Sequence, residues 1–488
     1  MADLSLELVL SATGGRLSGA ARRRRSPRRR RSPAPALFRG VSTDTRALPP
    51  GALFVALKGE RFDGHSFVAD AFARGAGAAL VSTEVEAAGA LVVVPDTLLA
   101  LGSLAAAHRA ALSPKVIAIT GSTGKTSVKE MLSAILSQGW KTARTPGNYN
   151  TEVGVPLALL ELDSSYQAAV IELAMRGPGQ IAYLARMTRP QVGVITNIGL
   201  SHLGLLGTRQ AIAEAKAELL ANLPGDGAAV LNADDDFFAL LVERSPCPVV
   251  SFGQRFDSAV AQVRAPSSGA LPASPDVAVD EVRVNADGSA RFRLRARWGE
   301  HHISLSVGGR HHALNAAAAA AAAIAAGADP AWIAPGLASF AGAEKRSRIV
   351  AAPGGFTVID DSYNAAPDSM RAAIELLEDL PGQRKWAALG DMRELGPMAP
   401  EWHREVGELA AASGIAGLVA VGELGHYIAE GALRLLAAEQ VVEVASNAEA
   451  GDALLERLGP GDAVLVKGSR AMAMEEIVAR LLASEGGG

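Results

Sequence analysis

Residues 116–127 read Val-Ile-Ala-Ile-Thr-Gly-Ser-Thr-Gly-Lys-Thr-Ser, a short apolar run that leads into a glycine-rich turn. The apolar run predicts a buried strand, and residues 127–136 have the pattern of a helix. The backbone N–H groups of such a turn, together with the helix N-terminus, attract phosphate oxygens. Lys125 can neutralise the terminal phosphates, and the hydroxyl of Thr126 can bind Mg²⁺. The sequence therefore predicts a binding site for ATP or GTP at this turn.

The turn is a shortened form of the commonest phosphate-loop pattern. That pattern has a glycine five residues before Gly124, where this chain has Ile119, and the match is the shorter G-x-x-G-K-T from Gly121. Such short strings also occur by chance, and an ordinary strand-to-helix turn with a surface lysine is the alternative. The strand before the turn and the helix after it favour a true phosphate loop.

The composition indicates a soluble chain with several domains. Of its 488 residues, 49% are hydrophobic and 20% are charged. A length prior of roughly 100–200 residues per domain predicts two to four domains. No apolar stretch is long enough to span a membrane, and the N-terminus lacks the pattern of a secretion signal. Cys247 is the single cysteine, so an internal disulfide is excluded and a cytoplasmic location is expected.

An arginine-rich insertion lies near the N-terminus. Eight arginines occur between Arg22 and Arg31, although the whole chain has a net charge of −4. Closely spaced like charges repel, and the flanking Ser-Pro pairs disfavour helix and strand, so we expect a disordered loop at about residues 20–36. The run can contact nucleic acid or anionic lipid by charge alone. A solvated low-complexity insertion is the favoured interpretation, and a nucleic-acid partner is not expected.

Three regions separate by pattern, and together they predict an α/β fold. The region 1–110 contains short strands and helices. The region 111–328 alternates continuous apolar strands with helices, which indicates a parallel sheet covered on both faces. Within it, residues 258–307 alternate apolar and polar side chains and predict an antiparallel meander at the sheet edge. The region 329–488 repeats the strand–helix alternation and predicts a doubly wound, Rossmann-like domain.

Polar residues follow several predicted strands. Glu172 follows one apolar run, and His202 closes the segment after another. In a parallel sheet the carboxyl ends of the strands share one edge, so we expect both side chains beside the phosphate loop, where they could ligate Mg²⁺. A capping role for either residue alone is the alternative. By its pattern alone, Lys216 is predicted to be a solvated surface lysine.

The same edge argument applies to the third region. Asp360-Asp361, Gly390-Asp391 and the segment from Lys467 to Arg470 each follow a predicted strand. We therefore expect them to gather on one edge of the C-terminal sheet.

The chain resembles the Mur ligases of peptidoglycan synthesis over nearly its whole length. Besides the phosphate loop, the resemblance includes Asp-Asp-Ser-Tyr-Asn-Ala at 360–365 and Leu-Gly-Asp-Met-Arg-Glu-Leu-Gly at 389–396. The matching segments are residues 42–46, 51–65, 121–127, 147–150, 171–175, 197–202, 215–218, 309–315, 360–365, 389–396 and 467–470. Each is a weak signal alone, but all of them stand in the order and spacing of the family.

The resemblance implies a role for each matching residue. Those at the phosphate loop and nucleotide would be Gly121, Ser122, Thr123, Gly124, Lys125, Thr126, Ser127, His311, Asn315 and Asp361. Those that bind the substrates would be Ser42, Asp44, Thr45, Gly64, His65, Asn148, Asn150, Tyr363, Asn364 and Lys467. Metal ligands would be Thr126, Glu172 and His202, and catalytic residues Lys125, Lys216, His202 and Arg348. Lys216 resembles the family's carbamylated lysine.

The resemblance also implies the reaction and the three-domain order. An N-terminal domain would bind the UDP-sugar, a central domain ATP and Mg²⁺, and a C-terminal domain would complete the ligase. Residues 361–369 are more similar to those of the members that add a dipeptide than to those of members that add one amino acid. The substrates would then be UDP-N-acetylmuramoyl-tripeptide and D-Ala-D-Ala, joined through an acyl phosphate. Whether the third stem residue is lysine or diaminopimelate stays open. A monomer is expected.

The chain departs from the family pattern at two places. The arginine-rich insertion is not a family feature. The Gly-Arg that usually precedes the first strand of the third domain is here Arg346-Ser347-Arg348, and Arg348 is favoured over Arg346 as the residue that approaches the γ-phosphate.

Two other functions are compatible with parts of the sequence pattern. A folylpolyglutamate synthase or another amide ligase would share the fold, but the long N-terminal region with residues 42–46 argues against it. A nucleic-acid-associated P-loop protein would use the arginine run. The acidic remainder of the chain and the lack of interleaved aromatic residues argue against that function.

Overall fold

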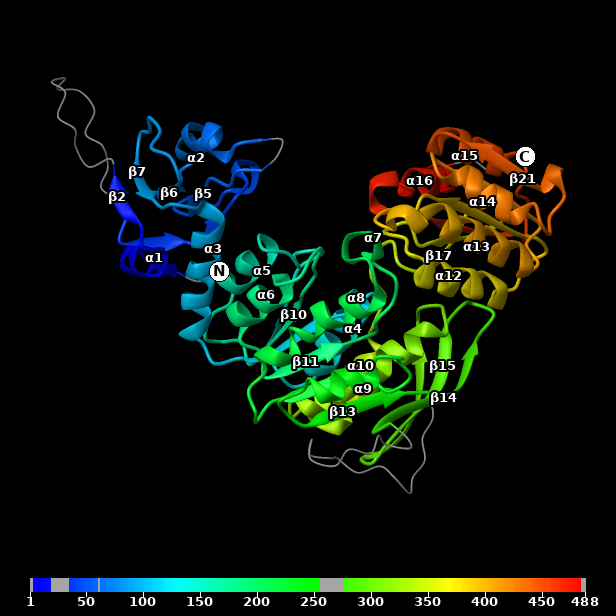
Figure 1. The fold of residues 1–488 in the computed structure, drawn as a ribbon, viewed down its shortest axis with the longest axis horizontal. Helices are drawn as coiled ribbons and strands as arrows, with labels where there is room; N and C mark the ends of the chain where they lie inside the picture. The colour runs from blue at the N-terminus through cyan, green and yellow to red at the C-terminus, as the bar shows by residue number, and fades with distance from the viewer. Residues whose placement is uncertain (1–2, 19–34, 60–61, 255–274, 484–488) are drawn as a thin grey trace. The chain divides into compact units, whose positions relative to one another are not determined.

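A computed structural model describes residues 3–18, 35–59, 62–254 and 275–483. The chain divides into two compact units (Figure 1). The first consists of Met1–Ala118, Trp140–Met175 and Gly179–Pro190, and the second of Ile119–Gly139, Arg176–Pro178 and Gln191–Gly488. The predicted disorder between Arg22 and Arg31 lies outside the described residues. The predicted domain boundaries at 110 and 328 stay predictions.

The first unit contains a five-stranded sheet of order β2-β7-β6-β5-β4 and a separate antiparallel pair, β1 with β3. In the larger sheet β2 is antiparallel to β7, and the other neighbours are parallel. The strands are β1 (Asp3–Ser5), β2 (Arg16–Ser18), β3 (Leu37–Arg39), β4 (Val41–Ser42), β5 (Leu53–Val55), β6 (Ala78–Val81) and β7 (Ala90–Val93). The short, mainly parallel strands agree with the pattern expected for this region.

Helix α3 (Thr97–Ala110) organises the rest of the first unit, because it packs against α1, α5 and α6. Asp96 caps it by accepting from the amide of Leu99 at 2.8 Å, which satisfies one of the free N–H groups at its start. Near its end the buried Arg109 donates from Nε to the carbonyl of Thr188 at 3.0 Å. The other elements are α1 (Leu6–Thr13), α2 (Val68–Ala73), α5 (Gly154–Leu160), α6 (Gln180–Thr188), β9 (Thr142–Arg144) and β10 (Ala168–Glu172).

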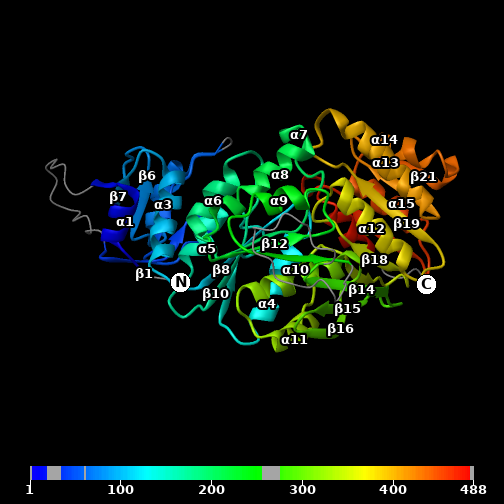
Figure 2. The ribbon, with the colours of Figure 1, turned by 60° about the horizontal axis from the view of Figure 1, so that its bottom comes forward.

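The second unit begins at the end of β8 (Lys115–Thr120), where the carbonyl of Thr120 accepts from the amide of Thr196 at 3.0 Å. Strands β11 to β14 are parallel, and β14, β15 and β16 form an antiparallel meander (Figure 2). The predicted meander is thus confirmed for its described part. The strands are β11 (Val192–Ile195), β12 (Ala228–Asn232), β13 (Val249–Gly253), β14 (Val277–Val284), β15 (Ala290–Ala296) and β16 (Gly299–Leu305).

Small side chains let the helices of this part approach closely. Helix α4 packs against α10, whose middle is a run of buried alanines, and against α11. A Cβ on Gly336 would lie only 2.4 Å from the Cα of Ile135, so this contact requires glycine. The helices are α4 (Lys125–Leu136), α7 (Leu203–Leu206), α8 (Arg209–Ala217), α9 (Phe238–Glu243), α10 (His311–Ala325) and α11 (Ile333–Ala338).

The C-terminal part is a six-stranded sheet of order β17-β18-β22-β19-β20-β21. Only β17 is antiparallel to its neighbour. The strands are β17 (Arg348–Ala351), β18 (Thr357–Asp360), β19 (Lys385–Gly390), β20 (Gly417–Val421), β21 (Val441–Val444) and β22 (Ala463–Lys467). This mainly parallel order confirms the α/β fold class predicted for the region.

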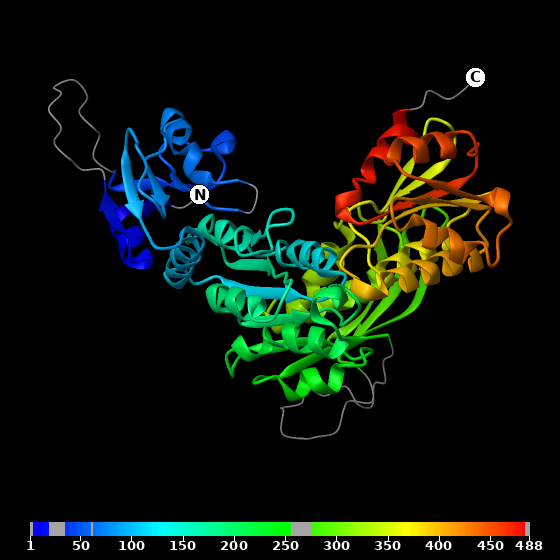
Figure 3. The same ribbon diagram turned by 45° about the horizontal axis from the view of Figure 1, so that its top comes forward.

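Helices cover both faces of the C-terminal sheet (Figures 1 and 3). One apolar core joins the sheet to α12, α13 and α14, and a second joins its other face to α15 and α16. These helices are α12 (Pro367–Asp379), α13 (Ala399–Ala412), α14 (Gly425–Ala432), α15 (Asn447–Leu455) and α16 (Glu475–Ala483). Because both faces are buried, polar side chains gather at the strand ends.

Within the described ranges, no helix combines the length and apolar character that a membrane crossing requires.

Candidate active site

The glycine-rich turn connects β8 to α4 and folds over its own lysine. The Nζ of Lys125 donates to the carbonyls of Gly121 at 2.8 Å and Ser122 at 3.2 Å. Helix α4 starts at Lys125, so its free N–H groups face the turn. The strand, turn and helix expected from residues 116–127 are therefore present, an arrangement that favours phosphate binding.

Two glycines of the turn have no room for a side chain. Gly121 has a φ of +150°, and a Cβ there would lie 1.8 Å from the Oγ1 of Thr196. Gly124 has a φ of +79°, and a Cβ there would lie 2.5 Å from the Oδ1 of Asn315. The positive φ values and the close neighbours both require glycine. Asn315, predicted at the nucleotide, thus lies against the phosphate loop.

Asn197 supports the loop from the end of β11, a role that the pattern of the chain did not reveal. Its Oδ1 accepts from the amide of Thr123 at 3.0 Å, and its Nδ2 donates to the Oγ1 of Thr123 at 2.6 Å. Ser122 is held as well, since its Oγ accepts from the amide of Gly199 at 2.9 Å. Asn197 belongs to a matched segment, and that membership was the only signal available in the sequence.

A pocket of about 190 Å³ brings the predicted nucleotide residues together. It joins the phosphate loop to the start of α10 and to the strand ends of the C-terminal sheet. The predicted site residues in its lining are Ser122, Thr123, Gly124, Lys125, Thr126, Ser127, His311, Asn315, Asp361, Tyr363, Asn364 and Lys467. Asp368 also lines it and was not among the predicted residues, and Arg346, the alternative to Arg348, lines it as well. Segments separated by more than 200 residues in the sequence thus form one site.

The C-terminal side of the pocket contains a buried ion pair. The Nζ of Lys467 donates to the Oδ2 of Asp361 and, at 3.0 Å, to the carbonyl of Asn364. The Oδ1 of Asp361 accepts from the amide of Ser347 at 3.0 Å. Lys467 was expected near the peptide substrates and Asp361 near the ribose, and in this structure they bind each other.

Two neighbouring histidines at the start of α10 line the same pocket. Burial lowers the pKa of His311 to about 4 and that of His312 well below its usual value. Their rings lie 4.2 Å apart between centroids. Both are therefore neutral near pH 7. The imidazole nitrogens of His312 have no hydrogen-bond partner among the described residues.

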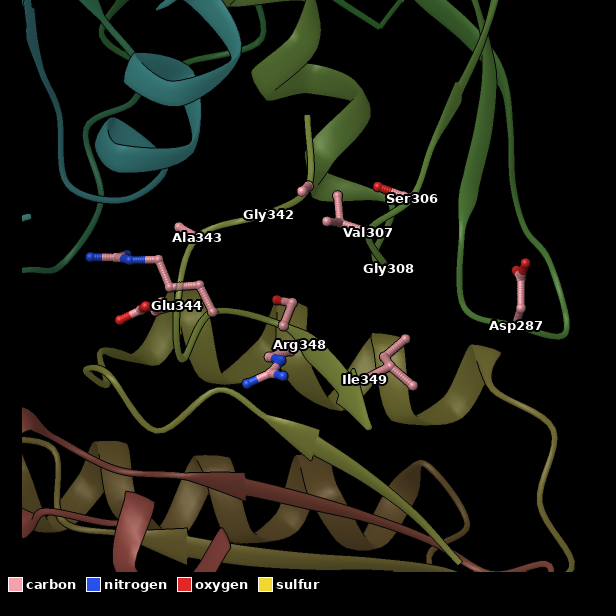
Figure 4. A pocket seen from close by; sticks show the side chains of 12 residues that line it. Asp287, Ser306, Val307, Gly308, Gly342, Ala343, Glu344, Arg348 and Ile349 are labelled. Carbon is pink, nitrogen blue, oxygen red and sulfur yellow. The ribbon is translucent and has the colours of Figure 1, made fainter. Parts of the chain in front are cut away.

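The two candidate arginines of the connecting segment lie in different places. Arg346 lines the nucleotide pocket, and its guanidinium carbon lies 4.1 Å from the centroid of the Tyr363 ring. Arg348 lines a second cavity of about 450 Å³ that also includes Arg346, Ser347 and the turn around Gly308 (Figure 4). In this arrangement Arg346 is the arginine on the wall of the nucleotide pocket, and the prediction for Arg348 stays a prediction.

Lys216 is not the surface residue that its local pattern predicts. It lies near the end of α8 with 1% of its surface exposed, because that side of the helix is packed into the second unit. Burial lowers its pKa well below the usual value, and the positive charge of Lys125 lowers it further. Burial therefore favours the neutral, nucleophilic form of the Lys216 amine over its charged form.

His202 contacts a carboxylate from the C-terminal sheet. It has a φ of +68° at the start of α7, and its Nδ1 lies 2.6 Å from the Oε2 of Glu394. The hydrogen bond from His202 is the main reason that the pKa of Glu394 is lowered. Arg176 lies 3.7 Å from the other carboxylate oxygen. An ionised Glu394 accepts a hydrogen bond from the Nδ1–H of His202, so in the neutral imidazole the opposite nitrogen keeps its lone pair.

In the first unit, Glu172 at the end of β10 is buried and contacts Asn150. The Nδ2 of Asn150 donates to the Oε1 of Glu172 at 2.8 Å, and the amide of Asn150 donates to the carbonyl of Asn148 at 2.8 Å. A predicted metal ligand and two predicted substrate residues thus lie together. The prediction that Glu172 faces the phosphate loop stays a prediction.

The remaining predicted substrate residues lie at strand ends and turns of the first unit. The carboxylate of Asp44 binds the side chain of Arg46 at 2.7 Å, which lowers the pKa of Asp44 to about 2. Ser42 and Thr45 are buried beside it. In the other turn, the Nδ1 of His65 lies 2.6 Å from Asp63, and its Nε2 accepts from the amide of Ser82 at 2.9 Å.

Gly64 precedes that histidine and has no room for a side chain. A Cβ there would lie 2.7 Å from the carbonyl of Leu57. Both nitrogens of the neighbouring imidazole are used within the protein, so His65 shapes this turn.

The side chains that could bind a metal ion suit Mg²⁺ that is shared with a substrate, and do not suit a metal ion held by protein ligands alone. Within the described part of the chain, no group of three or more His, Cys, Asp or Glu side chains has a metal-binding arrangement. Mg²⁺ usually binds through one or two protein carboxylates, waters and substrate phosphates. In the second unit, Thr126 and His202 could supply an oxygen and a nitrogen to an ion that is held mainly by a bound nucleotide, and Glu172 of the first unit stays a predicted ligand.

Three protein-family models match the chain in tandem. The model described as "Mur ligase family, catalytic domain" matches residues 37–109. "Mur ligase middle domain" matches residues 119–323, and "Mur ligase, glutamate ligase domain" matches residues 345–470. Together they cover most of the chain.

Full-length relatives are named for one activity. A Bacillus subtilis (strain 168) protein named UDP-N-acetylmuramoyl-tripeptide–D-alanyl-D-alanine ligase is 36% identical over 452 residues, 92% of this chain and 94% of that protein. An Escherichia coli (strain K12) protein of the same name is 38% identical over 456 residues, 90% of this chain and 93% of that protein.

Solved structures agree with this result. A crystal structure of MurF from Acinetobacter baumannii has a TM-score of 0.85 and 34% identity, and covers 99% of this chain and 100% of that one. MurF ligase from Thermotoga maritima in complex with ADP has a TM-score of 0.78 and 28% identity, with 91% and 97% covered.

Proposed function

The chain belongs to the Mur ligase family, and on that premise we propose that it is the ATP-dependent ligase of peptidoglycan precursor synthesis that adds D-alanyl-D-alanine to UDP-N-acetylmuramoyl-tripeptide. The observation that carries this assignment is the 38% identity over nine-tenths of the chain to a protein with that name. The pocket around the phosphate loop supports it, because it joins the elements that an ATP-dependent ligase requires.

The residues of the second unit would bind ATP. The phosphate loop from Gly121 to Ser127 would bind the phosphates through backbone N–H groups, and Lys125 would neutralise their charge. His311 and Asn315 would lie at the base, and Asp361 at the ribose. The neutral imidazole of His311 suits contact with an uncharged base, since its pKa is lowered to about 4.

The chemistry requires two anions to meet. The terminal carboxylate of the tripeptide attacks the γ-phosphorus of ATP, a P–O bond forms, and ADP leaves with the electrons of the broken P–O bond. Lys125 and one of Arg346 and Arg348 would cancel the repulsion and stabilise the charge of the transition state. The free amine of D-Ala-D-Ala then attacks the acyl carbon, an amide forms, and phosphate leaves.

Thr126, Glu172 and His202 would hold Mg²⁺, which when bound would supply Lewis-acid polarisation and offset the negative charge of the phosphates. The substrate residues of the first unit, Ser42, Asp44, Thr45, Gly64, His65, Asn148 and Asn150, would recognise the UDP-muramoyl part. Tyr363, Asn364 and Lys467 would lie near the peptides. The substrates are small molecules, and a cytoplasmic monomer is part of the proposal.

Lys216 would be carbamylated. Its neutral amine attacks CO₂, an N–C bond forms, and a proton is released, which replaces the uncharged amine by an anionic carbamate near the positive charge of Lys125. The depressed pKa of the buried amine supports this step, because only the unprotonated amine reacts. A carbamate signal from ¹³C-bicarbonate in the NMR spectrum of the wild type, absent in Lys216→Arg, would establish it. No signal in the wild type would refute it.

The function is tested by phosphate release from ATP and Mg²⁺. UDP-muramoyl-tripeptide and D-Ala-D-Ala are supplied separately and then together. Release only with both, with a product heavier by the dipeptide, is expected. Stimulation by folate with glutamate instead would support the alternative amide ligase. The folylpolyglutamate synthase of Mycobacterium tuberculosis shares the fold at a TM-score of 0.60 and 19% identity, which supports the fold alone.

A further inference from the structure

The turn after β19 reaches from the C-terminal sheet to α7, and it carries the carboxylate that contacts His202. The amide of Gly204 in α7 donates to the carbonyl of Glu394 at 2.9 Å, next to the side-chain contact of 2.6 Å between His202 and Glu394. A Cβ on Gly204 would lie 2.3 Å from the amide nitrogen of Gly396. Backbone and side chain thus hold the same two segments together.

We propose that Glu394 is a positioning residue for the metal site, which fixes the tautomer of His202 and makes metal affinity depend on this turn of the C-terminal sheet. The inference rests on the proposed function at one point, namely that His202 binds the metal ion.

The hydrogen-bond geometry determines which nitrogen of His202 is available. An ionised carboxylate can accept hydrogen bonds but cannot donate them. In the contact with ionised Glu394, the Nδ1 of His202 is therefore the donor. The lone pair then stays on Nε2, the nitrogen available to a metal ion. A carboxylate behind a ligating histidine orients the ring and increases the basicity of the other nitrogen, and loss of such a partner commonly costs about 10–100-fold in metal affinity.

The contact differs from an ordinary surface ion pair in its backbone support. Glu394 has a φ of +64°, and Gly396, two residues later, has a φ of +61°. Positive φ at a glutamate is uncommon and is maintained only where the surroundings require it. Here the turn presents both the carbonyl and the carboxylate of Glu394 to α7. A freely moving surface pair would not require this conformation.

The contact also explains how a weak ligand set could be regulated. Thr126 and His202 belong to the central part of the second unit, and Glu394 belongs to the C-terminal sheet. When the turn is in place, Nε2 is the stronger ligand. When the turn is displaced, the ring can rotate and exchange tautomers. Metal affinity would therefore report whether this turn is docked on α7.

The test measures Mn²⁺ binding, since Mn²⁺ replaces Mg²⁺ and its free ion is visible by electron paramagnetic resonance. Full-length wild type, Glu394→Gln and Glu430→Gln are titrated with Mn²⁺ in the presence of saturating ADP. Glu430 pairs with Arg404 on the exposed surface of the same C-terminal part and is the matched control. We expect Glu394→Gln to weaken Mn²⁺ binding by about 10–100-fold and Glu430→Gln to leave it unchanged.

A double-mutant cycle with His202→Gln separates positioning from a general structural role. If Glu394 acts through His202, the substitution has little further effect in the His202→Gln background. Equal weakening in both backgrounds, or wild-type affinity in folded Glu394→Gln, would overturn the inference. The Mn²⁺ titrations test the positioning role of Glu394 separately from the ligase reaction. Weaker binding in Glu394→Gln that disappears in the His202→Gln background supports this role even if the chain does not join D-Ala-D-Ala. Failure of the inference is therefore distinguishable from failure of the proposed function.

Discussion

Two buried lysines of the second unit differ in what surrounds their charge. Lys216, near the end of α8, is 1% exposed, and the charge that acts on it is that of Lys125. Lys467, at the C-terminal side of the pocket, is 2% exposed and pairs with Asp361. Among the described residues, no carboxylate pairs with Lys216, and burial beside the charge of Lys125 favours its neutral amine. The charge of Lys467 is neutralised by Asp361.

This difference indicates how the two regions contribute to the site. A buried charge without a partner destabilises a fold, so such a charge is kept where a ligand or a modification completes it. A buried pair with good geometry holds its surroundings in place. We therefore expect substitutions at the phosphate loop to affect catalysis more than stability, and substitutions at the Asp361–Lys467 pair to affect stability as well.

The largest effect is expected at Lys125. Lys125→Ala removes the cation that faces the phosphates, and we expect kcat for phosphate release to fall by about 10²–10³-fold. The unfolding midpoint should change little, because the Nζ of Lys125 donates to carbonyls of its own loop, those of Gly121 and Ser122. Lys141→Ala, an exposed lysine of the first unit, is the control. Wild-type kcat in Lys125→Ala would contradict the expectation that the phosphate loop contributes mainly to catalysis.

The next effect is expected at the buried pair. Asp361→Asn leaves Lys467 without its partner, and we expect a loss of about 3–5 kcal/mol in the free energy of unfolding of this part. The double variant Asp361→Asn with Lys467→Met should recover much of that loss, since no buried charge is left. Glu408→Gln, from an exposed pair with Arg434, should change stability by less than about 1 kcal/mol. Urea unfolding followed by circular dichroism measures these differences.

Substitution of Lys216 should increase the free energy of unfolding, whereas Asp361→Asn should decrease it. Lys216→Met removes a buried amine, and we expect the unmodified protein to gain about 1–3 kcal/mol in stability while ligase activity is lost. The pKa of Lys216 is lowered in the folded state, so the unfolded chain binds more protons at this residue. Wild-type stability should therefore rise as pH increases between the folded pKa and about 10.5, and Lys216→Met should flatten that rise. Destabilisation by Lys216→Met at pH 7 would contradict this account.

The smallest effect is expected at Asp44 in the first unit. Arg46 lowers the pKa of Asp44 to about 2 in the folded state. The contribution of this carboxylate to stability is therefore fully present above pH 3.8 and is lost as the pH falls through about 2. The pair is exposed, so Asp44→Asn should change the unfolding free energy at pH 7 by less than about 1 kcal/mol. If Asp44 contacts the uridine nucleotide, the same variant should raise KM for the UDP-substrate. Unchanged KM would remove Asp44 from the binding site.

Much of the fold could be predicted because its signals are local. The apolar run before Gly121 and the alternation between 277 and 305 gave the correct element types, since strand periodicity follows from burial on one or both faces. The ends of elements were less accurate. Helix α4 starts at Lys125, two residues before the predicted start at residue 127, because the helix begins directly at the end of the glycine-rich turn.

The site residues were predicted in part for the same reason. Lys125 and Thr126 lie in one continuous motif, so their spacing is visible in the sequence. Asn197 and Glu394 were missed as site residues, because each acts on a residue far away in the chain, Thr123 and His202 respectively. No local pattern distinguishes such a residue from a solvated polar side chain.

The amino-acid sequence by itself determined the order of strands and helices, the phosphate loop and, through its ordered motifs, the resemblance to the Mur ligases. Only the tertiary structure decided that Lys216 is buried, that Lys467 binds Asp361 and that Glu394 reaches His202. The physical reason is the distance along the chain over which each kind of interaction acts. Backbone pattern and glycine turns act over a few residues, whereas desolvation and charge pairing depend on which distant segments the fold brings together.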